Sequence, residues 1–374
     1  HLLFMSKEVL REIKLLREIA HPNVLRLEDV IMEVSLDTYA VADDDDTLTQ
    51  HVDAHKKRRT SSSESFFVGL VFEHPDGGNL RALQREIFDG QRSRLSVATM
   101  LKSIAQQLVC ALEYLHTNWI VHRDIRPENI HFDRRTGKIK LANFGLARIF
   151  RQPTRPPHKV DLAVADRWHR APELLLGSRS HHHHPCVDVW AAGCVLAEMM
   201  TGETLFAEDC MRLDGATAFR PPSSLDLISQ QSPLQHCDAS MCQSVFRMLG
   251  FPKKETCPSL AHLVHYQQAL VWERDKDGPA FPPESRLREH LLSKFLLPND
   301  ASTLQCAKDA SVDLGTLRKQ IEENRHQLVA LVECMLTMEP AKRPSAQTAL
   351  HHPYFFELCH PPPQGDFLSA MSER

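Results

Sequence analysis

Two neighbouring stretches decide the fold: VHRDIRPEN at residues 121–129 and LANFGLAR at residues 141–148. In the first, His122, Arg123, Asp124 and Asn129 form the pattern H-R-D-x-x-x-x-N. The second contains Asn143, Phe144 and Gly145 in succession. Short apolar segments at 130–132 and 138–142, separated by a turn at 133–137, predict a strand pair. This pair would carry Asn129 and Asn143 toward one another.

These two motifs resemble the catalytic core of a protein kinase, in which the second motif reads D-F-G. The resemblance implies phosphoryl transfer from ATP, which depends on positioned charge more than on covalent chemistry. It implies that Asp124 accepts the proton of the substrate hydroxyl and that Arg126 lies toward the γ-phosphate, where the family has a lysine. It also implies ATP and Mg²⁺ as cofactors, with Asn129 and Asn143 facing the metal.

Residues 6–20 predict an amphipathic helix, because apolar side chains recur every three or four positions. With HPNV at 21–24 it looks like the regulatory C-helix of cyclin-dependent kinases, and Glu12 would then pair with a lysine on the preceding strand. Taken alone, Glu12 is better explained as a solvated helix charge, and the motifs that follow in the chain reverse this balance. The phosphate loop and that lysine would precede His1, so we expect an N-terminally truncated fragment.

The predicted strands at 25–34 and 66–72 flank runs of aspartate, of lysine and arginine, and of serine. Such runs cannot bury enough apolar surface to become ordered, so we expect a disordered insertion at about 35–65. The second strand ends at Phe72, which is the gatekeeper in the kinase resemblance. Glu73, His74 and Pro75 would form the hinge, whose backbone bonds adenine. The boundary between a partial small lobe (1–75) and a large lobe (76–358) falls there.

The large lobe is predicted to be mainly helical, with periodic helices at 96–116 and 187–200. APE at 171–173 resembles the end of a kinase activation segment, and by this resemblance Glu173 pairs with Arg343. Asp188 would anchor the backbone of the loop that carries Asp124, and His122 and Phe144 are expected to be structural. Residues 208–242 are polar and aperiodic and predict an insertion. The proline-rich residues 359–374 predict a disordered tail.

The resemblance also assigns residues to an activation segment. Three arginines match the cluster that clamps a phosphothreonine in this family: Arg11, Arg123 and Arg148. Asp161 stands at the matching position, so we expect partial ordering without phosphorylation. Asp166 replaces a threonine near Asp124, and we hypothesise that it forms a bidentate pair with Arg126. Residues 164–170, with Arg170, would favour a proline after the phosphorylated residue.

Composition limits the remaining classes of protein. The 374 residues carry a formal net charge of −4, which gives no basic field for nucleic acid. The longest apolar run, near 187–200, is too short to span a bilayer. The ten cysteines lack paired C-x-x-C spacing, which favours a reducing compartment. We therefore predict an intracellular protein, cytoplasmic or nuclear, with neither nucleic acid nor membrane as a partner.

Taken together, the motifs predict an α+β, two-lobed protein kinase fold of the cyclin-dependent (CMGC) type. The small, β-rich lobe would be truncated and the large lobe mainly α-helical. Two functions remain open. One is a serine/threonine kinase for protein substrates, impaired because Asn143 removes a negative charge from the metal site. The other is a pseudokinase that binds a cyclin-like partner through the helix around Arg11 and Glu12.

Overall fold

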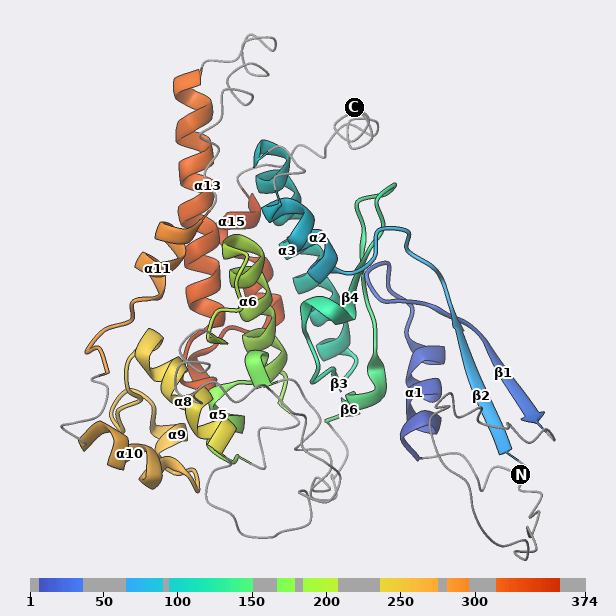
Figure 1. Cartoon of the computed structure of the whole chain (residues 1–374), viewed down its shortest axis with the longest axis horizontal. Coiled ribbons are helices and arrows are strands. Elements are labelled where there is room, and N and C mark those ends of the chain that lie inside the picture. The colour runs from blue at the N-terminus through green and yellow to red at the C-terminus, as the bar shows by residue number, and fades with distance from the viewer. Residues whose placement is uncertain are drawn as a thin grey trace, which may run out of the picture.

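The computed structural model describes eight segments of the chain: residues 7–35, 65–89, 94–150, 167–178, 184–207, 236–274, 281–295 and 314–356. These segments form a mostly helical α+β structure with few strands, which confirms the predicted fold class. Figure 1 shows α1, β1 and β2 on one side and the large helical body on the other. No helix within the described segments is long and apolar enough to cross a membrane.

The small lobe consists of one helix and one antiparallel strand pair: α1 (Lys7–Glu18), β1 (Leu27–Ser35) and β2 (Ser65–Phe72). Helix α1 buries Leu15 and Leu16 on one face, as its periodicity predicts. The pairing of β1 with β2 runs from Leu27 opposite Phe72 to Ser35 opposite Ser65. Both end residues of the predicted insertion at 35–65 therefore belong to strands, and 36–64 lie outside the described residues.

The large lobe is built around α6 (Cys186–Thr201), in which every residue is buried. A helix that is apolar on nearly all faces needs cover on all sides, and α3 and α13 both contact it. The other helices of this lobe are α2 (Leu80–Phe88), α3 (Arg94–Thr117), α5 (Pro172–Leu175), α8 (His236–Leu249), α9 (Pro258–Ala261), α10 (Tyr266–Arg274), α11 (Leu287–Lys294), α13 (Leu314–Met335), α14 (Ala346–Leu350) and α15 (Pro353–Phe356).

Helix α8 begins within the predicted insertion at 208–242, because residues 236–242 are helical. Met241, Cys242, Val245 and Phe246 of this helix are fully buried. A polar first turn precedes this apolar stripe, and the bounds of the insertion stay a prediction. Residues 208–235 and the predicted tail at 359–374 lie outside the described segments.

Four short strands position the two motifs. Strand β3 (Ile120–Val121) pairs with β6 (Arg148–Ile149), and β4 (Ile130–Phe132) pairs with β5 (Ile139–Leu141), both antiparallel. The HRD loop (residues 122–129) joins β3 to β4, and the NFG segment (residues 143–145) lies between β5 and β6. Both connections therefore run between the same two strand pairs. This topology places the two motifs side by side.

A buried ion pair joins Glu173, the last residue of the APE sequence, to Arg343, which lies between α13 and α14. The Arg343 guanidinium donates to both Glu173 oxygens, at 2.8 and 3.1 Å, and both side chains are 0% exposed. The same guanidinium donates to the Cys186 carbonyl at 2.8 Å and lies over the Trp190 ring. Burial alone would lower the pKa of Arg343, but Glu173 raises it above its usual range. The structure thus contains the pair that the sequence predicted.

A second buried carboxylate, Glu198, connects α6 to the HRD loop. Glu198 accepts hydrogen bonds from Arg81 Nη1 at 2.6 Å and from His169 Nε2 at 2.9 Å. Arg81 also donates to Glu128 at 2.9 Å, and Glu128 accepts from Arg126 at 2.9 Å. Charges of alternating sign therefore lead from the core helix to the HRD loop. Such a network stabilises one arrangement because every member needs its partners.

We predict that Arg343→Leu lowers the free energy of unfolding by about 3–5 kcal/mol, because it leaves Glu173 charged and buried. Urea denaturation followed by circular dichroism measures this change. Arg288→Leu is the matched control, since it breaks an exposed pair with Glu333 and should cost about 1 kcal/mol or less. Equal losses for the two variants would contradict the assigned role of the buried pair.

We also predict a pH-dependent contribution from Glu198. Burial alone raises its pKa, but His169, Thr204 and Arg81 together hold the pKa below the usual 4.5. The unfolded carboxyl therefore binds a proton at higher pH than the folded one. The contribution is complete above about pH 4.5 and is lost as the pH falls through the folded pKa.

Urea unfolding of Glu198→Gln at a series of pH values tests this contribution. The variant should show a smaller fall of the free energy of unfolding below about pH 4.5 than the wild type does. Glu18→Gln, at the exposed end of α1, should retain the wild-type slope. A wild-type slope in Glu198→Gln would refute the prediction.

Candidate functional site

The HRD loop is fastened to α6 through the carboxylate of Asp188. Its Oδ2 accepts the backbone N–H of His122 at 2.8 Å, and its Oδ1 accepts that of Arg123 at 2.7 Å. His116 Nε2 lies 3.0 Å from Oδ2. Burial alone would raise the pKa of Asp188, but His116 and the other partners hold it below its usual value. The carboxylate therefore stays charged and fixes the loop, as the sequence analysis expected.

The conformation of the loop depends on this anchor. Arg123 has a φ of 72°, a left-handed value that is uncommon outside glycine, asparagine and aspartate. Next to it, His122 is fully buried, and burial lowers the pKa of its imidazole. Its Nδ1 accepts the N–H of Asp124 at 3.2 Å, so the ring proton sits on Nε2, which faces the Ala142 carbonyl at 3.0 Å. This neutral histidine joins the HRD loop to the segment before Asn143.

The centre of the site is a hydrogen-bonded triad of Asp124, Asn129 and Asn143. Asn129 Nδ2 donates to the Asp124 carbonyl at 2.8 Å and to its Oδ2 at 2.7 Å. Asn143 Nδ2 lies 3.2 Å from the same Oδ2 and 3.2 Å from Asn129 Oδ1. The structure therefore brings together the three side chains that the sequence placed at the base and metal positions.

These three side chains, as they lie, do not fit Mg²⁺. Magnesium takes oxygen ligands in near-ideal octahedral geometry, usually with one or two carboxylates. Here Asn143 turns its N–H groups toward both Asp124 and Asn129, so hydrogens occupy the direction from which a cation would bind. Among the described residues, no group of three or more His, Cys, Asp or Glu side chains is placed to hold a metal.

Arg126 does not point freely toward a phosphate. Its Nε donates to Glu128 Oε2 at 2.9 Å, and Arg81 donates to the other oxygen of the same carboxylate. Burial alone raises the pKa of Glu128, but Arg126 and Arg81 lower it to about 2. Glu128 is thus fully charged at neutral pH. Asp166, the predicted partner of Arg126, lies outside the described residues, so that pairing stays a prediction.

A hydrogen bond between the Glu12 carboxylate and the backbone of Phe144 connects α1 to the NFG segment. Its carboxylate accepts the backbone N–H of Phe144, while burial raises the pKa of Glu12 above its usual value. A Cβ built on Gly145 would lie 3.6 Å from Asn143 Oδ1 and 3.7 Å from Glu12 Oε2. Phe144 is buried and packs edge-on against His122, with ring centroids 4.8 Å apart. Glu12 is therefore bound to the motif and is not simply a solvated helix charge.

The predicted hinge, residues 73–75, follows β2, and its Glu73 side chain is bound by other residues of the chain. Glu73 accepts hydrogen bonds from Lys140 Nζ at 2.8 Å and from the Arg26 N–H at 2.8 Å. Burial alone raises the pKa of Glu73, but Lys140 and Arg26 hold it below its usual value. Phe72 packs against the core, His74 is exposed, and Pro75 has no N–H to donate. Adenine recognition by this segment stays a prediction.

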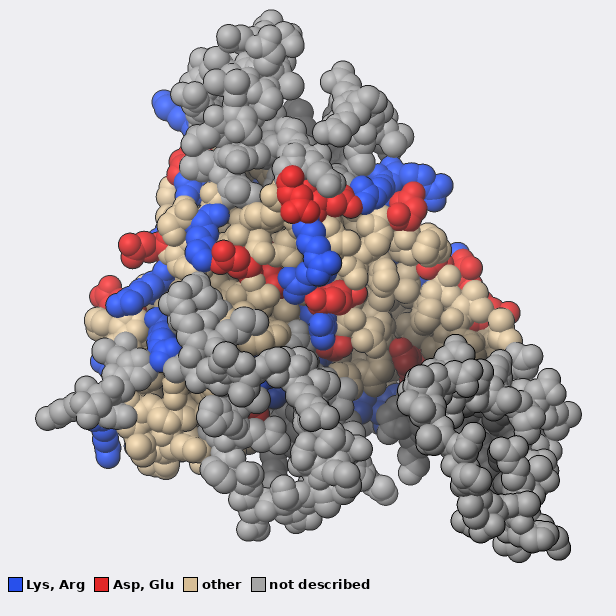
Figure 2. Space-filling model, viewed as in Figure 1, with Lys and Arg blue, Asp and Glu red and all other residues tan. Residues whose placement is uncertain are grey.

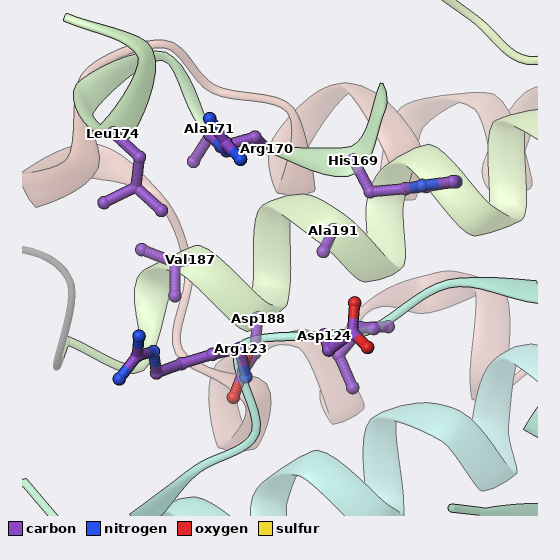
Figure 3. A pocket seen from close by; sticks show the side chains of 10 residues that line it. Arg123, Asp124, His169, Arg170, Ala171, Leu174, Val187, Asp188 and Ala191 are labelled. Atoms are coloured by element: carbon purple, nitrogen blue, oxygen red, sulfur yellow. The ribbon is translucent and has the colours of Figure 1, made fainter. Parts of the chain in front are cut away.

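Figure 3 shows a small cavity between the HRD loop and the segment before α5, with α6 as its floor. Asp124 and Asp188 line one side, and His169 and Arg170 line the other. Its volume of about 30 Å³ suits one or two water molecules and not a nucleotide. Arg170 Nη1 pairs with Asp238 Oδ1 of α8 at 3.1 Å. This pair joins the predicted peptide-positioning segment to α8.

The predicted arginine clamp is only partly described. Arg148 Nη1 donates to the Ala147 carbonyl at 2.8 Å, Arg123 lies in the HRD loop, and Arg11 lies on α1. Asp161, their expected counter-charge, falls outside the described residues.

Figure 2 shows Lys and Arg interspersed with Asp and Glu over the face that it displays. The described residues on that face form no broad patch of one sign.

The sequence analysis missed the Arg81–Glu128–Glu198 network. Arg81 and Glu128 lie 47 positions apart, and Arg81 and Glu198 lie 117 apart. One signal was available, because Glu198 is, with Asp188, one of two charged residues in the largely apolar helix α6. A buried carboxylate needs partners, so Glu198 predicts a buried counter-charge without naming it.

Comparisons with known proteins agree with this geometry. A profile of the protein kinase domain matches residues 4–355. The chain is 28% identical over 353 residues to the serine/threonine-protein kinase ssn3 of Aspergillus fumigatus, covering 94% of this chain and 66% of that protein. It is 29% identical over 351 residues to the SSN3 kinase of Coccidioides immitis, covering 94% of this chain and 61% of that protein.

Among solved structures, the chain resembles one in the yeast RNA Pol II CTD kinase CTDK-1 complex, with a TM-score of 0.61 and 23% identity. The likeness covers 97% of this chain and 86% of that one and concerns the fold. The resemblance that the sequence predicted is therefore confirmed: this chain belongs to the protein kinase domain family.

Proposed function

We propose that this chain is a serine/threonine protein kinase of the cyclin-dependent type whose transfer of phosphate from ATP to protein substrates is impaired. Its curated relatives carry the name serine/threonine-protein kinase, although the chain spans less than two thirds of their length in several cases. The observation that carries the proposal is the triad at the HRD loop. Asp124 is retained and held in place, whereas its neighbour Asn143 is an amide that donates to it.

Asp124 is positioned for its proposed role as proton acceptor. Its backbone N–H is bound by His122, and the flanking His122 and Arg123 N–H groups are bound by Asp188. Both amides of the triad bind Oδ2. The other oxygen, Oδ1, is then the acceptor for the proton of a substrate serine or threonine hydroxyl. A fixed carboxylate of this kind typically contributes a factor of about 10²–10⁴ to the rate.

Two features support impairment. Asn143 supplies no negative charge where the family has a metal-binding aspartate, and metal assistance is worth several kcal/mol in such reactions. Arg126 is engaged by Glu128, so a phosphate would have to compete with a carboxylate for the same guanidinium. ATP and Mg²⁺ are the general cofactors of this family, and the use of ATP by this chain is part of the proposal.

A second candidate function is a catalytically inactive kinase that binds a cyclin-like protein. The closed triad favours it, because Asp124 and Asn129 are satisfied within the chain. Helix α1 supplies a surface, since its side chains at Val9, Leu10 and Ile13 are only partly buried. The similar solved structure is of a kinase complex. A partner that covers these side chains would also fix Glu12 against Phe144.

We predict that Asn143→Asp raises the rate of phosphate transfer from radiolabelled ATP and Mg²⁺ to a serine/threonine peptide by about a hundredfold or more. The added carboxylate restores a contribution of several kcal/mol, and each factor of ten corresponds to about 1.4 kcal/mol. Asn118→Asp, the same change at an exposed site, should leave the rate unchanged. No gain in Asn143→Asp would refute an otherwise intact site and favour the binding function.

We further predict that Ile13→Asp weakens binding to recombinant cyclin-fold proteins by about tenfold or more, since it places a charge on the apolar face of α1. A loss of about 1.4 kcal/mol of binding free energy gives a tenfold change. Biolayer interferometry measures the affinity. Glu18→Lys, at the exposed end of the same helix, is the control. Unchanged affinity in Ile13→Asp would remove α1 from the interface.

A further inference from the structure

We propose that the side-chain amide of Asn143 replaces the divalent cation of this site, so that the triad holds its closed arrangement without metal and the nucleotide-free protein gains no stability from Mg²⁺. The inference rests on the proposed function, because it takes the triad to be the former phosphoryl-transfer site. It follows from the misfit between the triad and Mg²⁺, and it concerns a property that can be measured without catalysis.

The hydrogen-bond network fixes which end of each amide faces Asp124. A carboxylate can only accept, so both amides must present nitrogen to Asp124 Oδ2. Asn129 uses its nitrogen for Asp124, which leaves Asn129 Oδ1 toward Asn143. Asn143 Nδ2 then satisfies two acceptors with its two hydrogens. Its own oxygen lies beside Gly145, 3.6 Å from the place of a Cβ built on that residue. The assignment follows from counting donors and acceptors.

The charge balance of the site changes with this one residue. An aspartate at position 143 would bring a second carboxylate to about the distance that now separates Asn143 Nδ2 from Asp124 Oδ2, 3.2 Å. Two carboxylates at such a distance cannot both be charged without cost, and a cation between them removes that cost. The asparagine instead supplies N–H donors and no charge. The negative charge of the triad is therefore that of Asp124 alone, and no second carboxylate needs a cation to compensate it.

The backbone conformation at position 143 suits asparagine and aspartate equally, so the two side chains can be compared there without a change in backbone strain. Asn143 has φ 65° and ψ 73°, in the left-handed region. Asparagine and aspartate are the non-glycine residues that adopt this region most readily. Exchanging asparagine for aspartate therefore changes the charge and the hydrogen-bond donors of the side chain and keeps the backbone preference. Glycine is suited to the same φ, so Asn143→Gly removes the amide without strain.

Thermal unfolding of the nucleotide-free chain tests the inference in EDTA, in millimolar MgCl₂, and in NaCl at the ionic strength of the MgCl₂ sample. The wild type should unfold at the same Tm in all three. Asn143→Asp should lose about 3–6 °C in EDTA, and MgCl₂ should restore most of this loss while NaCl should not. These shifts are the size expected for a local repulsion in a domain of this length.

Two control variants separate the bridging amide from general effects. Asn143→Gly should lose a few degrees under all three conditions, because the bridge is gone and no charge replaces it. Asn118→Asp adds the same charge where the native amide bonds only the Tyr114 carbonyl, and it should show no specific response to MgCl₂. These two results together assign the metal response of Asn143→Asp to its position beside Asp124.

The inference is overturned if MgCl₂ stabilises the wild type as much as it stabilises Asn143→Asp, or if Asn143→Asp in EDTA unfolds at the wild-type Tm. Neither result depends on ATP or on a substrate. Failure of the proposed kinase function would instead appear as absent phosphate transfer in Asn143→Asp. The two failures are therefore observed in separate measurements and are not confused.

Discussion

The bonds from the Asp188 carboxylate to two backbone N–H groups hold the site together. They keep Arg123 in a left-handed conformation that its side chain disfavours, and so they set the direction in which Asp124 leaves the backbone. Asp188 can do this because it sits on α6, which is wholly buried. The HRD loop is therefore fastened to the wholly buried helix of the large lobe. Without that carboxylate, the strained loop would relax.

Buried charge recurs as a structural device in this lobe. Glu173 and Glu198 are both inaccessible to water, and each is satisfied by an arginine from a distant part of the chain. The Glu173–Arg343 pair joins the APE sequence to the segment between α13 and α14. Glu198 is connected to the HRD loop through Arg81 and Glu128. Such pairs add little stability compared with apolar packing, but removing one partner is costly. They select one arrangement of the segments around Asp124.

Within this rigid frame, one substitution changes the character of the site. The two strand pairs bring Asn143 to Asp124 whatever its side chain, because the HRD loop and the NFG segment each connect one strand pair to the other. An amide there donates hydrogen bonds where a carboxylate would repel. The kinase fold and Asp124 are kept, and in our proposal the amide removes the electrostatic need for a metal. Structure and catalysis are thus separable at this position.

The sequence alone determined the kinase family, the lobes, the main helices and the members of the triad, because these depend on local periodicity and on motifs of a few residues. It did not identify the start of α8 within the predicted insertion at 208–242, since a polar first turn precedes the buried stripe of that helix. Only the tertiary structure decided that Asn143 donates to Asp124, that Arg126 is held by Glu128, and that Glu198 joins Arg81 to His169. These contacts join residues that are far apart in the chain or depend on which atom faces which, and neither property is carried by local sequence pattern.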